Sequence, residues 1–556
     1  MNHPRRAFPN GKIGWTALVA LAFGAAGATA FAEATKEVVN GQYVVTVPQG
    51  ETYKLTDADV AELGASDFVK RGAGTLTVPV GLTAIQSYAG RIYIYEGIYN
   101  SSCDKGTGSS EAKVFVDGGT FQNSFQKGGA IVYPSEMHFK GTGHCDGTKN
   151  LGAFRNLCNI MNGFRAIVLD GDALFTVGRF LGVDAAAPFA VMRTLDMGGY
   201  TLTLRADDNV TPVNAQMTIA AAVGKAISNM GDFVIDRAHL SSGALLGKGT
   251  TSLTLLSGSV YDYIKASGAT SGGLSHGGVN LVLENDTTLR VQTETALYAA
   301  DGYNNNWWGS VTVKGRTTVT NLASAAPGSY ILFGGKVTGP GGFDVKGGAK
   351  LVFKSSGNDA NDFAGDITVE GIPVAAGTTV NGVASGRAGG EICGVLGAVI
   401  GLNAGAIPTN VGQKVVLRNG HFIHAQAALP AVESSGTGVV FSTSASAYTV
   451  PALTGCPAFT NGTATLTGTW TVRPEDVAAE KPLEALSDGA FAFGAGSRVV
   501  LSDEAATADG ESRLTKGATG LGAVLSQRLE STRFRLKRLA GDLWLALRGG
   551  LCIILK

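Results

Sequence analysis

The chain has 556 residues, and its 44 lysines and arginines balance 44 aspartates and glutamates, which gives no electrostatic reason to expect nucleic acid or an anionic membrane as a partner. Glycine is the outlier at 79 residues, twice the usual share of about 7%. Only 16% of residues are charged and 44% are apolar. A disordered chain has few apolar and many charged residues, so this composition argues against disorder. It favours many short strands joined by glycine-rich turns.

Residues 1–32 are predicted to be a signal peptide. Arg5, Arg6 and Lys12 give a positive start, an apolar run follows, and Ala30-Phe31-Ala32 fits the small-x-small rule for cleavage before Glu33. An uncleaved membrane anchor is the alternative, but the core is short and rich in Gly and Ala for a spanning helix. We therefore expect an exported protein that is extracellular, on the cell surface or associated with the outer membrane.

From residue 41 onward, short runs with period-two alternation, such as SLTLL, NLVLE and SVTVK, are separated by turns that contain Gly, Asn or Asp. This alternation puts one face of each strand into a core and the other toward solvent. Expected strands lie within residues 41–47, 90–97, 112–119, 199–209, 231–236, 250–259, 277–291, 308–321, 414–422 and 463–472. The helix candidates are short, Asp57–Leu63 and Pro474–Ala479, so the chain is predicted to be all-β.

One motif occurs twice, at residues 70–97 and 345–371. Both copies read a basic residue, a glycine turn, a Leu-centred strand, a bend, an aromatic-Ala-Gly step and a second strand. The spacing is irregular, which indicates a degenerate repeat with a unit in the twenties to thirties of residues.

A single short strand pair cannot bury its inner face, whereas stacked units about 4.8 Å apart share a continuous core. This favours a parallel β-helix over the alternative, a string of β-sandwich domains. Glycine belongs at the corners, where several positions need positive φ or leave no room for Cβ. We expect Leu76, Val78, Leu351 and Phe353 to point into the bore, and Thr75, Thr77 and Lys350 to face outward.

The motif resembles the autotransporter-associated β-strand repeat, also called the passenger-associated transport repeat. The matching positions are Lys70, Gly72, Gly74, Leu76, Val78, Tyr88 and Gly90, with a weaker match at Lys346, Gly348, Leu351, Phe353, Phe363 and Gly365. The resemblance implies a right-handed parallel β-helix that is exported and displayed by a bacterium. It implies no catalytic residue and no cofactor. The β-helix is expected over residues 33–530, with its clearest repeats at 68–97 and 343–371.

The tail, residues 531–556, departs from a full autotransporter. It offers three strand candidates, Phe534–Leu539, Leu543–Leu547 and Leu551–Leu555. A translocating barrel needs at least about eight strands. The tail is therefore predicted to be a strand cap that covers the open end of the solenoid, with an anchoring or sorting tail as the alternative.

Six cysteines stand at Cys103, Cys145, Cys158, Cys393, Cys456 and Cys552. Export permits disulfides, but their density is low and no CxxC occurs. A bridge from Cys103 to Cys145 or Cys158 is the favoured local pairing, and unpaired buried thiols are the alternative.

Three histidine-containing stretches are candidates for metal binding, and each favours a structural interpretation. His421 and His424 form HxxH, but on a strand their rings face opposite sides. The turn His144-Cys145-Asp146 has no second ligand cluster at zinc-finger spacing. His276 is expected in a solvated loop. No metal site is predicted.

Two further kinds of loop could bind a ligand. Acidic turns at residues 205–209, 356–363 and 501–511 could hold calcium, but they do not repeat as in calcium-binding solenoids, and Asx-turns explain them. In the loop at 301–309, Trp307 and Trp308 lie beside asparagines and could stack on sugar rings. The favoured interpretation is that one Trp plugs the core and the other packs on it.

The expected function is that of a structural or adhesin-like surface protein whose loops bind glycans or cell-surface proteins, with no catalysis and no transmembrane helix in the mature chain. The alternative is a β-helix carbohydrate-active enzyme, a polysaccharide lyase or glycoside hydrolase. Such an enzyme would group two carboxylates, or a carboxylate and a base, within about 10 Å on one outer sheet face.

Overall fold

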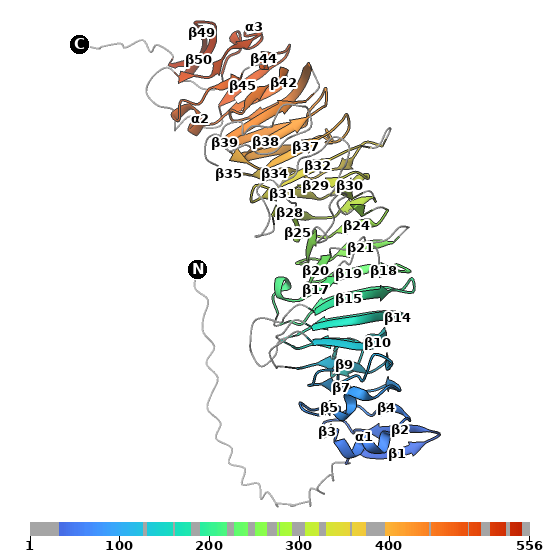
Figure 1. Cartoon of the computed structure of the whole chain (residues 1–556). Helices are drawn as coiled ribbons and strands as arrows, with labels where there is room; N and C mark the ends of the chain where they lie inside the picture. The colour runs from blue at the N-terminus through green and yellow to red at the C-terminus, as the bar shows by residue number, and fades with distance from the viewer. Residues whose placement is uncertain are drawn as a thin grey trace, which may run out of the picture.

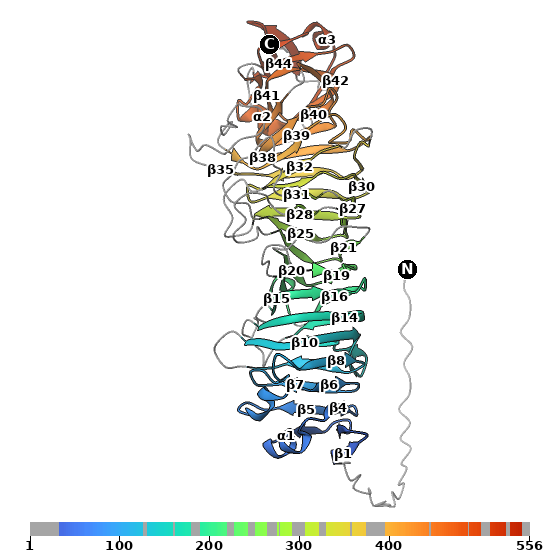
Figure 2. The same cartoon turned by 45° about the vertical axis from the view of Figure 1, so that its right-hand side comes forward.

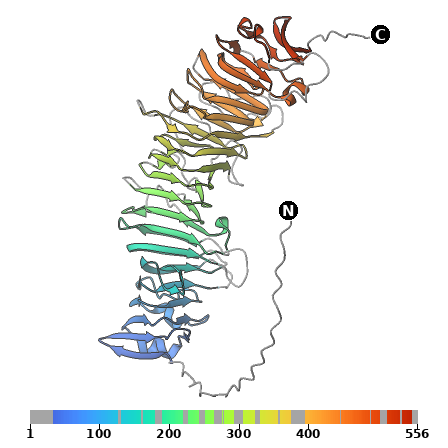
Figure 3. The same cartoon turned by 180° about the vertical axis from the view of Figure 1, so that it is seen from behind.

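A computed structural model describes residues 33–125, 131–158, 162–178, 189–208, 210–219, 227–242, 251–263, 275–276, 278–291, 306–307, 309–321, 330–355, 359–373, 395–443, 446–486, 489–501, 512–529 and 534–547. The predicted signal peptide and the strand candidate Leu551–Leu555 lie outside the described residues. The chain forms one elongated parallel β-helix whose strands stack in chain order along a curved rod (Figures 1 and 3). The fold predicted from the sequence is confirmed.

Three parallel sheets, here named A, B and C, form the sides of the solenoid. Sheet A contains β2 (Gln42–Thr46), β4 (Asp67–Arg71), β6 (Arg91–Ile94), β8 (Lys113–Asp117), parts of β10 (Ile131–Gly141), β14 (Asn162–Val177) and β15 (Phe189–Asp196), β18 (Ile227–Ser228), β23 (Ser275–His276), β26 (Asn306–Trp307), β29 (Tyr330–Phe333), β32 (Lys350–Phe353), β37 (Ala398–Gly401), parts of β38 (Lys414–His424) and β39 (Ala431–Ser442), β41 (Ala458–Thr460), β43 (Leu483–Ala485) and β47 (Thr515–Lys516).

Sheet B contains β3 (Thr52–Lys54), β5 (Thr75–Val78), β7 (Ile98–Ser101), β9 (Thr120–Asn123), β13 (Phe154–Asn156), the end of β14, β16 (Leu202–Ala206), β19 (Phe233–Asp236), β21 (Ser252–Leu255), β24 (Asn280–Leu283), β27 (Val311–Val313), β30 (Val337–Gly339), β33 (Asp362–Phe363), parts of β40 (Ala447–Thr454) and β42 (Gly462–Val472), β44 (Gly489–Phe493) and β48 (Ala518–Thr519).

Sheet C contains the first parts of β10, β14 and β15, then β17 (Gln216–Ile219), β20 (His239–Ser242), β22 (Val260–Tyr263), β25 (Thr287–Val291), β28 (Arg316–Asn321), β31 (Gly342–Lys346), β34 (Ile367–Glu370), the first parts of β38 and β39, the ends of β40 and β42, and β45 (Arg498–Leu501). The longest strands bend from one sheet into the next at register shifts, as β10 does between Tyr133 and Glu136. Figure 2 shows the stacked strands from a second angle.

The varying length of the coils explains the irregular repeat. Near the first end of the rod, Phe68 pairs with Ile92, and Ile92 pairs with Val114. Farther along, Leu281 pairs with Val311, so the chain there takes a longer path before it returns to the same ladder. Each coil therefore adds one strand to each ladder at about 4.8 Å spacing while the turns vary in length. These coils have the predicted unit in the twenties to thirties of residues, but the coil from Ile367 to Val415 is longer and the coil from Lys414 to Ala431 is shorter.

One hydrophobic core fills the bore from Tyr43 to Leu545. Leu76, Val78, Leu351 and Phe353 are fully buried in it, as the alternation predicted. Thr75, Thr77 and Lys350 alternate with them and are only partly buried, because they lie on the outer faces. A second cluster lies on the outer face of sheet A and contains Tyr330, Leu332, Val352, Ala398, Ile400 and Ile423.

Both ends of the rod carry antiparallel strands. At the first end, β1 (Thr35–Val39) pairs antiparallel with β2, and α1 (Asp57–Leu63) follows with the bounds expected from the sequence. At the second end, β50 (Asp542–Leu547) pairs antiparallel with β49 (Phe534–Leu539) and β46 (Ser512–Arg513). The side chains of Phe534, Leu543 and Leu545 join the core, so this sheet closes the bore as the predicted cap.

The remaining elements are short and lie in the turns. They are β11 (Cys145–Asp146), β12 (Lys149–Asn150), β35 (Ile372–Pro373), β36 (Val395–Leu396), α2 (Pro474–Ala478), α3 (Gly522–Leu525) and the 3-10 helices η1 (Ala84–Ser87) and η2 (Pro212–Asn214). Within the described residues, no helix is long and apolar enough to cross a membrane.

The two motif copies occupy different corners of the solenoid. In the first copy the glycine turn joins β4 of sheet A to β5 of sheet B, whereas in the second it joins β31 of sheet C to β32 of sheet A. The basic residues consequently differ in environment: Lys70 is fully buried, and the Lys346 side chain is 45% exposed. The motif therefore marks a tight corner and not a fixed position in the coil.

Candidate functional sites on the outer faces

Charged side chains on the outer faces pair across neighbouring coils. Lys113 Nζ lies 2.8 Å from Glu136 Oε1 on sheet A, and Lys314 Nζ lies 2.7 Å from Glu284 Oε1 on sheet B. Exposed pairs of this kind contribute little to stability. They neutralise each other's charge on the outer faces. Charged groups that are buried, or that keep a nitrogen or oxygen without a hydrogen-bond partner, are the better candidates for a functional site.

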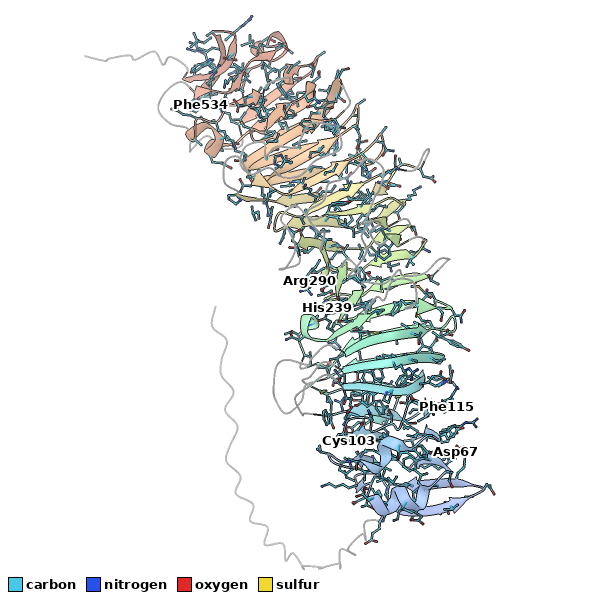
Figure 4. All side chains as sticks on the ribbon, viewed as in Figure 1. Asp67, Cys103, Phe115, His239, Arg290 and Phe534 are labelled. Carbon is cyan, nitrogen blue, oxygen red and sulfur yellow. The ribbon has the colours of Figure 1, made fainter. Side chains whose placement is uncertain are left out.

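One such site lies on sheet C and contains His239, Asp262 and Arg290, which we call the sheet C cluster. The three residues come from the consecutive strands β20, β22 and β25. Asp262 on β22 pairs with Arg290 on β25 in the ladder. On the opposite side of β22, Asp262 pairs with Ser241 of β20, and His239 lies two residues before Ser241 on that strand. Figure 4 shows His239 and Arg290 close together at one edge of the rod.

Arg290 and Asp262 form a bidentate ion pair. Arg290 Nε donates to Asp262 Oδ1 at 2.5 Å, and Arg290 Nη2 donates to Oδ2 at 2.9 Å. The Asp262 side chain is 4% exposed and that of Arg290 25%. A buried carboxylate needs such a partner, because an unpaired charge in this position would lose its hydration without compensation. The aspartate thereby fixes the plane of the guanidinium.

The imidazole of His239 completes the cluster. Its Nε2 lies 2.7 Å from Asp262 Oδ2 and 3.0 Å from Arg290 Nη2. Because the ionised carboxylate can only accept, Nε2 carries the hydrogen that makes the shorter contact. The His239 side chain is 2% exposed, so it is placed to orient Asp262 and not to exchange protons with a bound molecule.

A second Arg–Asp pair on the same sheet provides a contrast. Arg316 Nε donates to Asp344 Oδ2 at 3.0 Å, Nη1 donates to the carbonyl of Asp366 at 2.8 Å, and Nη2 donates to Thr368 Oγ1 at 2.7 Å. Every nitrogen of this guanidinium is engaged by the protein. Arg290, by comparison, has no hydrogen-bond partner for Nη1 among the described residues.

A column of planar side chains covers the outer face of sheet A. It contains Tyr93, Phe115 and His138, which are neighbours on β6, β8 and β10. The Tyr93 and Phe115 rings lie 5.1 Å apart at 16°, and the Phe115 and His138 rings 4.5 Å apart at 26°. Phe115 lies on the opposite edge of the rod from Arg290 in Figure 4.

This aromatic column is closed to a flat ligand. Each ring covers the face of the next, and Tyr95 continues the stack beside Tyr93 with Arg71 over its ring. Sugar stacking requires a free aromatic face. The column is therefore best explained as packing between coils.

His138 ends the column between two carboxylates. Its Nε2 lies 2.9 Å from Glu136 Oε1 and its Nδ1 lies 3.1 Å from Asp170 Oδ1. The ring fills the space between the two carboxylates, which would have to be open to a sugar in a glycosidase.

The predicted histidine geometry is confirmed. His424 points into the bore, where its ring lies 4.5 Å from that of Tyr448, whereas His421 lies on the outer face and its Nε2 is 3.0 Å from the Val395 carbonyl oxygen. Burial lowers the pKa of His424 to about 4. Burial also lowers the pKa of His421. The two rings share no ligand position.

The favoured disulfide is not formed. Cys103 is a buried thiol, and Cys145 lies exposed on the small hairpin of β11 and β12, where Sγ contacts the Gly147 carbonyl at 3.2 Å. The Cys158 thiol hydrogen-bonds to the carbonyl of Phe125. Burial raises the pKa of Cys103 to about 12 and raises that of Cys456 further, so both remain protonated thiols near neutral pH. Cys393 and Cys552 lie outside the described residues.

The acidic turn at residues 205–209 is held by cations of the protein itself. Asp207 pairs with Arg155 at 2.8 Å and with Lys149 at 3.1 Å, and Asp208 pairs with Arg237 at 3.3 Å. Parts of the turns at 356–363 and 501–511 lie outside the described residues. No group of three or more possible metal ligands occurs within the described part of the chain.

Trp307 plugs the core, which confirms the part of the favoured interpretation that concerns one tryptophan. It is fully buried, its Nε1 donates to the Val279 carbonyl at 2.7 Å, and its ring packs edge-on against Tyr261. Trp308 lies outside the described residues, as does part of the loop. The predicted loop position of His276 is wrong, because its backbone belongs to the strand β23.

Sequence reasoning missed the sheet C cluster. His239, Asp262 and Arg290 lie on three successive coils and are far apart in the sequence, so no short motif joins them. The coil period was the available signal, because residues one period apart on the same face become neighbours. No family model, curated protein or solved structure matches this chain.

Proposed function

We propose that this protein is an exported, surface-displayed β-helix that binds partners along its outer faces, with a structural or adhesin-like role. The observation that carries the proposal is the uninterrupted core from Tyr43 to Leu545. Such a core makes a stiff rod in which each coil contacts its neighbours, and stacked coils form extended surfaces suited to binding. The N-terminal apolar segment and the corner motif that resembles the passenger repeat support the export of this rod.

Display can be tested in the native host. Intact cells are labelled with an antibody raised against the mature chain, and the protein is recovered for N-terminal sequencing. We expect labelling without cell lysis and a mature N-terminus at Glu33. Recovery of the protein from the cytosol with Met1 retained would contradict export and, with it, the proposed function.

Partner binding is tested separately. The purified mature chain is incubated with intact cells and with immobilised glycans, and bound protein is measured against a denatured sample as the control. Binding above the control supports the adhesin-like role. Absence of binding to every surface would leave the protein without the proposed contact function.

A carbohydrate-active enzyme is the second candidate, and the sheet C cluster is the observation in its favour. It groups a carboxylate with a histidine and an arginine on one outer sheet face, which the enzyme alternative requires. The 2% exposure of the His239 side chain argues against proton transfer to a substrate. Incubation of the mature chain with a panel of polysaccharides decides between the two, because product release would support an enzyme.

A further inference from the structure

We propose that Arg290, Thr320 and Lys346 form a binding track for an anionic linear glycan that lies along sheet C, parallel to the axis of the rod. We call these three residues the sheet C track. The proposal rests on the proposed function, because it names the class of partner and the part of the outer face that contacts it.

The three residues of the sheet C track lie side by side on consecutive strands. Arg290 on β25 pairs with Thr320 on β28. Val319 pairs with Val345 on β31, which places Thr320 beside Lys346. Neighbouring strands are about 4.8 Å apart, so the backbones of Arg290 and Lys346 stand about 10 Å apart with Thr320 between them. A linear polymer along the axis meets one of these side chains at every coil.

The Arg290 guanidinium is preoriented by the protein. Asp262 holds Nε and Nη2, so the guanidinium plane is fixed before any ligand arrives. Nη1 makes no hydrogen bond within the described residues, and a quarter of the side chain is exposed. A preoriented N–H pair of an arginine matches the oxygen atoms of a carboxylate. Because the folded protein already orders this long side chain, binding a ligand loses less conformational entropy.

The local charge at the Lys346 end of the track is positive. Lys346 and Arg418 share the single carboxylate of Glu370, at 3.7 Å and 3.0 Å. The groups at this end of the track therefore carry one net positive charge. Arg290 is neutralised by Asp262, and no further carboxylate contacts it among the described residues. The track thus favours an anion over a cation.

The positions beside the track carry hydroxyl side chains. Thr288 and Thr318 form the adjacent outward column on β25 and β28, and both are partly exposed. Hydroxyl side chains on both columns give a glycan uncharged donors and acceptors between the cations. The cluster residues His239 and Asp262 act only as positioning groups, because Asp262 holds Arg290, His239 orients Asp262, and both are nearly inaccessible.

The test measures binding of polygalacturonate oligosaccharides to the purified mature chain by titration calorimetry, with neutral dextran and dextran sulfate as the other arms. We expect polygalacturonate to bind, dextran not to bind, and affinity to fall as salt is raised. Arg290→Gln should weaken binding about tenfold or more, because it removes a hydrogen bond to a charged group. Lys346→Gln should weaken it by a smaller factor.

Two further variants keep the test decisive. Arg290→Lys retains a cation beside Asp262 but loses the free Nη1, so binding should weaken while the thermal midpoint stays close to that of the wild type. Lys314→Gln removes an exposed lysine on sheet B and should leave binding unchanged. Equal affinity of the wild type and both Arg290 variants would overturn the proposal, as would preference for dextran sulfate over polygalacturonate.

Failure of this inference can be told from failure of the proposed function. A chain that is displayed and binds cells but not polygalacturonate would refute the track alone. A chain that binds polygalacturonate but stays in the cytosol would refute the surface role and leave the track intact. Release of shortened oligosaccharides during the titration would instead show that the site is catalytic, which would overturn a role in binding only.

Discussion

The ammonium nitrogen of Lys70 donates a hydrogen bond of 2.6 Å to the carbonyl oxygen of Gly72. The same nitrogen lies 2.8 Å from the Arg71 carbonyl and 3.1 Å from that of Glu96, on the next coil. One buried lysine therefore ties two successive corners together. Burial lowers its pKa to about 8, and the charge of Glu96 opposes this shift, so the side chain keeps its proton at pH 7.

Lys70→Met should destabilise the protein by about 2–4 kcal/mol, because the carbonyls of Gly72 and Glu96 lose the donor that this buried side chain provides. The Arg71 carbonyl still accepts from the Val47 N–H. The matched control is Lys346→Met, at the corresponding motif position, which should change stability by less than about 0.5 kcal/mol because that side chain is exposed. Urea unfolding followed by circular dichroism measures both. Equal effects would contradict the carbonyl-cage role of Lys70.

The glycine next to this corner leads to a second prediction. A Cβ built on Gly74 would lie 2.0 Å from the Pro48 carbonyl oxygen and 2.7 Å from that of Glu51. Both are backbone atoms of the preceding coil, so they cannot move aside cheaply. Gly74→Ala should cost about 3 kcal/mol. Gly522→Ala is the control, since that Cβ would meet nothing within 4 Å at the start of α3, and it should be neutral or slightly stabilising. Thermal unfolding compares the two variants.

Much of the fold could be predicted from the sequence because strand alternation and corner glycines are local signals. The helix Asp57–Leu63 and the strand Phe534–Leu539 have the bounds that the pattern indicated. What could not be predicted is which corner of the coil each motif occupies. Turns of unequal length shift the ladder, so the two motif copies fall on different corners and Lys70 points inward while Lys346 points outward.

The candidate site was harder to predict for the same reason. Whether Asp262 and Arg290 become neighbours depends on the length of the turn between β22 and β25, and composition does not fix that length. Disulfide pairing also depends on how the coils stack. The bridge from Cys103 to Cys145 or Cys158 proved wrong, whereas the alternative of an unpaired buried thiol is correct for Cys103, and Cys145 sits on an exposed hairpin. Conversely, the opposite orientation of His421 and His424 followed from strand geometry alone.

His424 should make the stability of the protein depend on pH. It is fully buried in the bore, its Nδ1 accepts from the Gln426 N–H at 3.3 Å, and burial lowers its pKa to about 4. An unfolded histidine titrates near 6.5. Between about pH 6.5 and pH 4 the unfolded chain therefore binds a proton that the folded chain does not, and stability falls on acidification by up to about 3 kcal/mol.

His424→Phe isolates this contribution. Phenylalanine suits the position, because Phe353 occupies the same ladder position two coils earlier, and Nε2 of His424 makes no hydrogen bond within the described residues. Unfolding midpoints are measured from pH 7 to pH 4 for both proteins. The variant should lose less stability over this range than the wild type. Parallel curves would mean that His424 is protonated in the folded protein.

The first end of the rod depends on Asp59. This buried carboxylate accepts hydrogen bonds from Lys36 Nζ at 2.8 Å, from the Tyr53 hydroxyl at 2.8 Å and from Thr56 Oγ1 at 2.6 Å. Burial raises the pKa of Asp59, but the hydrogen bonds from Lys36, Thr56 and Tyr53 outweigh burial and hold it below its usual range. The stability that this group contributes is therefore present above about pH 4 and is lost as the pH falls below it.

Asp59→Asn should consequently release the N-terminal cap at neutral pH. The amide cannot accept from all three donors and leaves Lys36 without its counter-charge, at a cost of about 3 kcal/mol. Coils contact mainly their neighbours, so the loss should stay local. Hydrogen exchange followed by mass spectrometry should show faster exchange in β1, β2 and α1 and unchanged exchange in the central coils. Asp57→Asn, in the same helix turn but exposed, is the control and should exchange like the wild type. Uniformly faster exchange along the rod would show instead that the end cap and the solenoid unfold as one cooperative unit.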